Sequence, residues 1–330
     1  MRMFARKGKG WENGAYLHDF QSGQEKRQPM TTPLNILLIG GSGFVSGTLA
    51  RLAVSRGHAV TAITRGQRAL SDGVTPLIAD RKDRPAFAAA IEAANTDWDL
   101  VVDCIGYDAE DARQDVDIFR ARAKHLVFIS TDFVYAPDKR RFPQGEDDAD
   151  YLNHSYGGKK REAELVLSEA DTGQMGWTVL RPCHIYGPGS LLGCLPEHGR
   201  DPQLIDRLRR GETLRLVGGG HYLQQPILAE DLAQTILSCA GNVAAHGQIC
   251  NASGPTIVES WQYYQIIADI LGVPLAVEEL SVADYLRASP ERASFFCHRI
   301  YDLSRLAACG LHVPATPLSD GLRGHVESLL

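Results

Sequence analysis

The chain has 330 residues and a net charge of −6, with 44% hydrophobic and 22% charged residues. This composition excludes a disordered, collagen-like or disulfide-stapled protein and predicts one or two globular domains with a sizeable core. The balance of 40 acidic against 34 basic residues gives no reason to expect a nucleic-acid or membrane partner.

Residues 1–30 are polar and somewhat basic and contain no apolar core of a secretory signal, so we expect a disordered extension there. From Thr31 onward, short apolar runs alternate with amphipathic stretches. The apolar runs predict strands at Ile36–Ile39, Ala59–Ile63, Val74–Ile78, Leu100–Cys104, His125–Ser130 and Trp177–Leu180. The stretches between them predict helices at Phe44–Ser55, Ala86–Ala94 and Ala109–Ala123. Such alternation indicates an α/β fold with a doubly wound parallel sheet of the Rossmann type.

The second half of the chain has a different pattern, with glycine- and proline-rich loops and mixed helices. Helices are predicted at Ala229–Ala240, Val258–Leu271 and Asp302–Ala308. We therefore predict a dinucleotide-binding domain over residues 31–180. A smaller mixed α/β substrate-binding part follows over residues 181–330, and some of its segments are expected to return to the first sheet.

Cysteine and histidine spacing gives no sign of disulfides or of a metal site. The seven cysteines include no C-x-x-C pair, and the 11 histidines include no H-x-x-x-H pair. We expect reduced thiols in a cytoplasmic protein and no zinc. No apolar stretch reaches the roughly 18 residues that span a membrane.

The glycine-rich loop Gly40–Gly47 follows the first predicted strand and opens a helix. Glycine permits a tight turn and close backbone approach, and free N–H groups at a helix start can hold a pyrophosphate. The loop therefore predicts a dinucleotide site, with Gly40, Gly43, Phe44 and Val45 among its contacts.

The second predicted strand ends at Thr64, where an NAD enzyme commonly carries an acidic residue for the ribose 2′-hydroxyl. Arg65 and Arg68 follow and could meet a 2′-phosphate. We therefore expect NADP or NAD, with NADP slightly favoured. The alternative is a pair of solvated surface arginines.

Tyr156 and Lys160 lie four residues apart at the start of a predicted helix, so both project from one face. A lysine charge near a phenol lowers the phenol pKa and makes it usable as an acid or base. Thr131 and Asp132 end the fifth strand, where parallel sheets form their ligand crevice. In a chain without the preceding Rossmann segments, we would interpret Tyr156 and Lys160 as an exposed pair on a helix. Thr131 and Asp132 would then be polar residues that cap the end of a strand.

As an ordered set, these motifs resemble the extended short-chain dehydrogenase/reductase superfamily, and within it the NAD-dependent epimerase/dehydratase family. The resemblance covers Asn35 to about His325. Further segments that carry it are Asp80-Arg81, Ser130–Tyr135, Leu180–Pro188 and Glu230–Ala233.

The resemblance implies that Tyr156 is the catalytic acid/base, that Lys160 supports its pKa and holds the nicotinamide ribose, and that Thr131 orients the substrate. It also implies cofactor contacts at Asp80, Arg81, Cys104, Ile105, Gly106, Pro182 and Cys183. Substrate contacts are implied at Tyr107, Asp132, His184, Gln224 and Arg292, the last near a family position for a substrate phosphate.

Three departures from the family pattern bear on the reaction. Ser46 replaces the third glycine of the loop, so we expect slightly looser packing of the first helix. Phe133 stands where sugar dehydratases carry Glu, which argues against a 4,6-dehydratase. Gln224 stands where many members place an arginine on the substrate pyrophosphate, so a free sugar or a sugar phosphate joins nucleotide sugars as a candidate.

We therefore expect an NAD(P)-dependent oxidoreductase or epimerase that acts on a carbohydrate-like hydroxyl or ketone. Loop Leu191–Arg200 would set its specificity, and a homodimer would form through the helices at Ala109–Ala123 and Ser155–Ser168. The alternative is a non-catalytic or RNA-binding protein from an atypical branch of the same family. The chain also resembles that branch, in the start of the glycine loop, in Thr64-Arg65-Gly66 and in Gln224. The retained Tyr156, Lys160 and Thr131 favour the enzyme.

Overall fold

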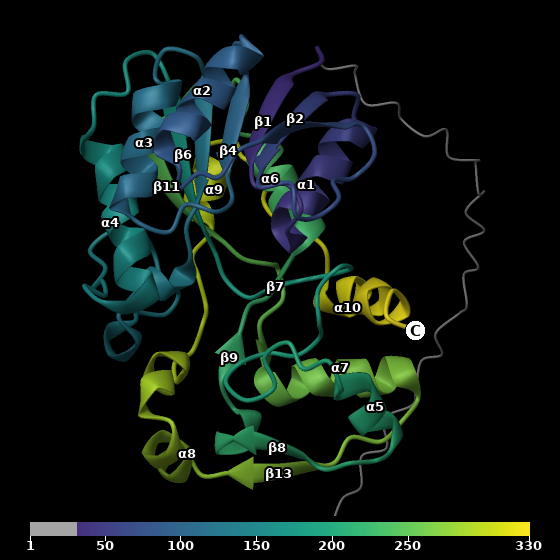
Figure 1. Cartoon of the computed structure of the whole chain (residues 1–330). Helices are drawn as coiled ribbons and strands as arrows, with labels where there is room; N and C mark the ends of the chain where they lie inside the picture. The colour runs from purple at the N-terminus through teal and green to yellow at the C-terminus, as the bar shows by residue number, and fades with distance from the viewer. Residues whose placement is uncertain (1–31) are drawn as a thin grey trace, which may run out of the picture. The chain divides into compact units, whose positions relative to one another are not determined.

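The computed structural model describes residues 32–330, and the extension expected over residues 1–30 lies outside the described residues. A seven-stranded sheet forms the centre of the described region (Figure 1), and every neighbouring pair of its strands is parallel. Its order is β11-β6-β5-β4-β1-β2-β3, which confirms the predicted doubly wound fold. The strands are β1 (Asn35–Ile39), β2 (Ala59–Thr64), β3 (Val74–Ile78), β4 (Leu100–Asp103), β5 (His125–Ile129), β6 (Gly176–Pro182) and β11 (Gln248–Ala252).

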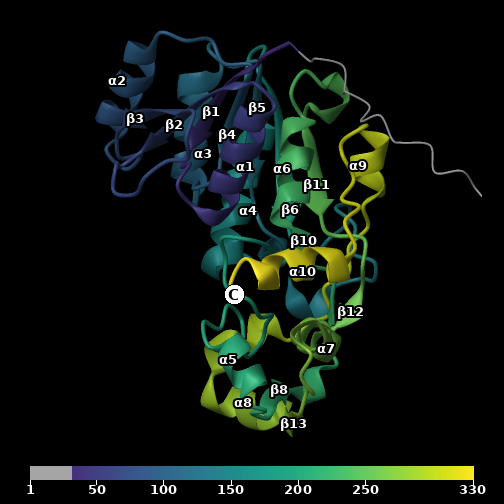
Figure 2. The ribbon, with the colours of Figure 1, turned by 90° about the vertical axis from the view of Figure 1, so that its right-hand side faces the viewer.

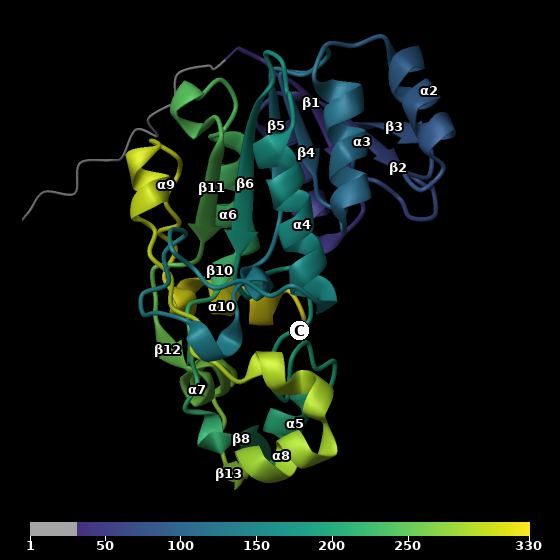
Figure 3. The same ribbon diagram turned by 90° about the vertical axis from the view of Figure 1, so that its left-hand side faces the viewer.

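Both faces of the sheet are apolar, and helices cover each of them. In β1, Ile36 and Leu38 join one buried cluster, while Leu37 and Ile39 join the other, because successive side chains point to opposite faces. The first face carries α1 (Phe44–Ser55), α6 (Ala229–Leu237) and α9 (Ser304–Ala308), as Figure 2 shows. The second face carries α2 (Arg84–Ala94), α3 (Ala109–Phe119) and α4 (Ser155–Glu169), of which α3 and α4 stand in front in Figure 3.

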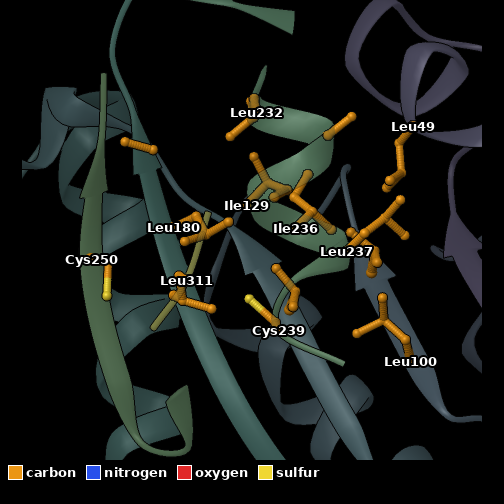
Figure 4. Close-up of a cluster of buried hydrophobic side chains, with 14 of the residues drawn as sticks. Leu49, Leu100, Ile129, Leu180, Leu232, Ile236, Leu237, Cys239, Cys250 and Leu311 are labelled. Carbon is orange, nitrogen blue, oxygen red and sulfur yellow. The ribbon is translucent and has the colours of Figure 1, made fainter. Parts of the chain in front are cut away.

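The core of the first face lies between α6 and the centre of the sheet. Figure 4 shows Leu232 and Ile236 of α6 on one side of Leu180 of β6, and Cys250 of the neighbouring strand β11 on the other side. All four side chains are fully buried, and burying each leucine or isoleucine stabilises the fold by roughly 1.5–3 kcal/mol. Cys250 serves here as a small apolar residue, and all seven cysteines are free thiols.

A smaller lobe follows the sheet and has its own buried cluster around Tyr263 and Ile267 of α7. In it β8 (Leu214–Val217) pairs in parallel with β13 (Val277–Leu280). The lobe contains α5 (Leu204–Arg209), α7 (Ser260–Leu271) and α8 (Val282–Ala288), and α10 (Leu318–Glu327) packs on α7. Two short pairs join the lobe to the sheet: β7 (Ile185–Tyr186) with β10 (Ile227–Leu228), and β9 (Leu223–Gln224) with β12 (Val258–Glu259).

Several predicted boundaries differ from the structure for local reasons. Helix α2 begins at Arg84, two residues earlier than predicted, because the Asp83 side chain accepts the Ala86 N–H at 3.1 Å and caps it. The predicted helix Val258–Leu271 begins only at Ser260, since its first two residues form β12. Strand β11 was not predicted. Within residues 32–330, no helix combines the length and apolar character needed to cross a bilayer, and no group of three or more metal-ligating side chains gathers.

Candidate functional site

The glycine loop lies at the carboxyl end of β1, where the sheet order reverses between β1 and β4. Gly41 has a φ of 138°, and a Cβ there would come within 2.6 Å of Ala62, so only glycine fits. The buried Ser46 hydroxyl accepts the N–H groups of Gly41 at 3.0 Å and Gly43 at 3.1 Å. The first N–H groups of α1, beginning at Phe44, have no acceptor within the helix and can receive an anion.

A groove of about 500 Å³ runs from this loop along the ends of β2 and β3. Thr64, Arg65 and Arg68 line it beside Asp80, and all but Thr64 are exposed. The Thr64 hydroxyl accepts the Gly66 N–H at 3.1 Å, while neither Arg65 nor Arg68 forms a salt bridge within the described part of the chain. The two guanidinium groups are therefore available to a ligand in the groove.

Arg81 also borders the groove, but its guanidinium is buried and bonded to protein carboxylates. It lies 2.7 Å from Asp103 Oδ2 and 3.5 Å from Asp111 Oδ1. Asp103 in turn accepts the Ile105 N–H at 2.9 Å, and Asp111 accepts the Tyr107 N–H at 3.0 Å. The geometry therefore makes Arg81 a support for the loop after β4.

Lys160 is almost fully buried, and its ammonium donates to the carbonyls of Gly106 at 2.5 Å and Ile129 at 2.6 Å. It also lies 4.7 Å from the centre of the Phe128 ring. Burial lowers the Lys160 pKa to about 8, partly offset by Asp103. The lysine thus ties α4 to the loop after β4 and to the end of β5.

Tyr156 lies in the first turn of α4 and is half exposed, at 48%. Burial, together with Tyr107 and Asp132, raises its pKa to about 12, and a hydrogen bond with Thr131 opposes that rise. The lowering of this pKa that we expected from Lys160 is not found, because burial of the phenol is the largest effect on its pKa; the ammonium donates to two backbone carbonyls.

Gly157 lets α4 approach the segment that carries Thr131. A Cβ on Gly157 would lie 1.9 Å from the Phe133 carbonyl oxygen, so the helix start and the 3₁₀ turn η1 (Asp132–Val134) meet at van der Waals distance only because this residue is glycine. Thr131 caps that turn, and its hydroxyl accepts the Phe133 N–H at 3.2 Å.

A second cavity, of about 360 Å³, opens beside the groove and is lined by the catalytic candidates Thr131, Tyr156 and Lys160. Cys104, Tyr107 and Arg200 line both the groove and the cavity, so the two spaces adjoin. Other predicted residues on the cavity wall are Asp132, Pro182, Cys183, His184 and Gln224. Burial lowers the His184 pKa to about 4, which keeps its imidazole neutral.

The cavity includes Arg299, which the sequence did not single out, and Arg200, the last residue of the loop expected to set specificity, and it excludes Arg292. Arg200 enters from the loop after β7, and Arg299 enters from the segment after α8. Arg292 does not line the cavity, and its guanidinium donates to the Tyr285 hydroxyl at 2.7 Å. No local pattern marks Arg299, because its partner Asp132 lies 167 residues away in the chain.

Comparison with known sequences assigns the chain to one family. Residues 36–253 match the family described as NAD dependent epimerase/dehydratase. A chloroplast stem-loop binding protein of 41 kDa from Arabidopsis thaliana is 27% identical over 269 residues, which cover 74% of this chain and 68% of that protein. A dTDP-4-dehydrorhamnose reductase from Streptomyces griseus is 31% identical over 223 residues, which cover 64% of this chain and 66% of that protein.

Solved structures of low sequence identity share the fold. The epimerase Mth375 from Methanothermobacter thermautotrophicus superposes with a TM-score of 0.74 at 15% identity, covering 90% of this chain and 92% of that one. A UDP-glucose 4-epimerase from Thermus thermophilus in complex with NAD superposes with a TM-score of 0.70 at 17% identity, covering 90% and 99%. At these identities the likeness concerns the fold alone.

Proposed function

Because the chain belongs to the NAD-dependent epimerase/dehydratase family, we propose that it is an NAD(P)-dependent oxidoreductase or epimerase. Its substrate is a hydroxyl or ketone of a nucleotide sugar, a sugar or a sugar phosphate. The observation that carries this proposal is the junction of groove and cavity at Cys104 and Tyr107, with Tyr156 and Lys160 beside it. The names of several relatives, a dTDP-sugar reductase and a UDP-sugar decarboxylase among them, support a nucleotide sugar.

The groove fits a dinucleotide. Gly41 allows the tight turn that lines the groove, and the amides of Phe44 and Val45 at the start of α1 would receive the pyrophosphate. Asp80 would contact the adenine, and Arg65 with Arg68 would receive a 2′-phosphate, which favours NADP. When bound, the nicotinamide supplies the hydride acceptor or donor.

Tyr156 would transfer the proton at the substrate oxygen while Thr131 holds that oxygen by a hydrogen bond. Burial raises the pKa of Tyr156 to about 12, so the phenol is protonated near neutral pH and can donate to a ketone oxygen, the step that a reduction requires. Lys160 would hold the ribose and contribute positive charge, since it lines the cavity and its ammonium donates to Gly106 in the loop after β4.

We propose that the reaction is not a 4,6-dehydration, since Phe133 offers no carboxylate at the position of the dehydratase acid. Its ring packs against the Arg299 guanidinium at 4.3 Å instead. We also propose a cytoplasmic homodimer through α3 and α4. Light scattering after gel filtration would measure the mass of the particle in solution. Replacing Leu165, a partly exposed residue of α4, by a charged residue should dissociate the dimer.

The first test is to denature the purified protein and identify any nucleotide that it carried. NAD or NADP at about one per chain supports an enzyme that regenerates its cofactor in place, hence an epimerase. An empty protein that binds added NADPH more tightly than NADH supports a reductase with exchangeable cofactor. Failure to bind any of the four nucleotides would refute the proposal.

RNA binding is the second candidate, and the stem-loop binding protein among the relatives is the observation that favours it. Phosphate-driven binding weakens steeply with salt, so a gel-shift series with a stem-loop RNA from 50 to 200 mM salt tests it. A shift that disappears with rising salt and persists in Tyr156→Phe would support RNA binding independently of catalysis.

A further inference from the structure

A buried charge cluster at the cavity wall contains more arginine than carboxylate. Asp132 forms salt bridges with Arg299 and, at 3.7 Å, with Arg140, and the Tyr301 hydroxyl donates to the same carboxylate oxygen. The two arginine side chains are 1% and 3% exposed. Within residues 32–330, Asp132 is the only carboxylate that forms a salt bridge with either arginine. One of the two buried positive charges therefore lacks a counter-charge.

An uncompensated buried charge is costly, and proteins keep one where a ligand supplies the missing partner. Arg299 borders the cavity, whereas Arg140 does not. The Nε of Arg299 is buried and has no hydrogen-bond acceptor among the described residues. A negatively charged group in the cavity would provide the missing charge to Arg299.

Two further side chains on the same wall carry buried nitrogen atoms without a partner in the described region. They are Nε2 of Gln224, a residue only 2% exposed, and Nε2 of His184. The exposed Arg200 adds a second positive charge at the rim. The wall thus carries several possible hydrogen-bond donors, a pattern that suits a ligand group rich in acceptor oxygens.

The positive charge lies next to the proton-transfer residues. Asp132 directly follows Thr131 in the chain. The Phe133 ring lies next to both Tyr156 and Arg299: its centre is 6.5 Å from the centre of the Tyr156 ring and 4.3 Å from the Arg299 guanidinium. A group bound at Arg299 therefore lies on the same side of the cavity as the reacting oxygen.

We propose, building on the function proposed above, that the sugar-like unit bearing the reacting oxygen also carries an anionic group, a carboxylate or a phosphate ester, which binds at Arg299. The substrate class is therefore an acidic or phosphorylated sugar, free or attached to a nucleotide.

The test is titration calorimetry of the full-length protein, saturated with whichever dinucleotide it binds. Glucose is the neutral probe, glucuronate and glucose 6-phosphate are the anionic probes, and UDP-glucose is compared with UDP-glucuronate. We expect each anionic sugar to bind about 10- to 100-fold more tightly than its neutral match. Glucuronate against glucose 6-phosphate separates a carboxylate site from a phosphate site.

The variant Arg299→Gln should abolish this preference, whereas Arg215→Gln, at an exposed position of β8, should keep it. Equal binding of charged and neutral sugars by the wild type would overturn the inference, even if Arg299→Gln does not fold. If the wild type binds no dinucleotide, the proposed function is overturned instead. Failure of the inference and failure of the proposed function are therefore distinguishable.

Discussion

Substituting Gly157 by alanine tests how closely α4 and the Thr131 segment approach each other. The added Cβ would lie 1.9 Å from the Phe133 carbonyl oxygen, whereas ordinary contacts begin at 3.4 Å, so the helix start must move by about 1.5 Å. Overpacking of this kind costs about 1–3 kcal/mol, and alanine regains about 0.5–1 kcal/mol of helix propensity. Because the clash is with a backbone atom, the upper part of this cost applies, and we expect Gly157→Ala to lower the free energy of unfolding by about 1–2.5 kcal/mol.

The matched control is Gly324→Ala in α10, where a Cβ would meet no atom within 4 Å. It should stabilise the protein by about 0.5–1 kcal/mol, so the two variants differ in sign. Urea denaturation with a shared m-value measures both changes. A Gly157→Ala protein at least as stable as the wild type would show that α4 and the turn after β5 do not meet as described, and our account of how Tyr156 and Thr131 come together would fail.

Three other predictions concern the cofactor, the proton transfer and the buried lysine. The double variant Arg65→Ala, Arg68→Ala should weaken NADPH binding about 10-fold or more and leave NADH binding nearly unchanged. Fluorescence titration measures both affinities, with Arg215→Ala as the control. Equal losses of affinity for the two nucleotides would contradict the assignment of these arginines to the 2′-phosphate. Tyr156→Phe should lower kcat about 10²–10⁴-fold while dinucleotide affinity stays within a factor of about two. A smaller loss of kcat would show that a residue other than Tyr156 transfers the proton. The Lys160 pKa is lowered in the folded protein, so the buried charge costs stability below pH 8, and this cost is relieved as the pH rises from about 8 toward the unfolded value. Urea titrations at pH 7 and pH 10 should therefore show that the free energy of unfolding of the wild type, relative to that of Lys160→Met, is larger at pH 10. If this difference in free energy does not change with pH, the lowered pKa is refuted.

The central strands were predictable because each is a short apolar run buried on both faces. Strand β11 was not, because it carries the polar residue Asn251 in a fully buried position. That side chain is satisfied by the Tyr135 hydroxyl at 2.6 Å and by the Gln144 carbonyl at 2.9 Å, more than 100 residues away. A local pattern cannot show such partners, so the sequence alone does not predict a strand there.

The same limit applies to the site. The glycine loop and the Tyr156–Lys160 pair are local motifs whose spacing is visible in the sequence. Arg200 and Arg299 reach the cavity from loops whose path depends on the packing of the smaller lobe. Arg292, which a family position suggested, turns to Tyr285 instead.

The Ser46 hydroxyl holds the glycine loop in shape by accepting two N–H groups that come from the loop itself. The loop therefore does not have to be ordered at the moment of encounter, and little conformational entropy is lost when the nucleotide docks. Association should then proceed in a single kinetic phase without a slow isomerisation, and differences in affinity between nucleotides should appear mainly in their dissociation rates.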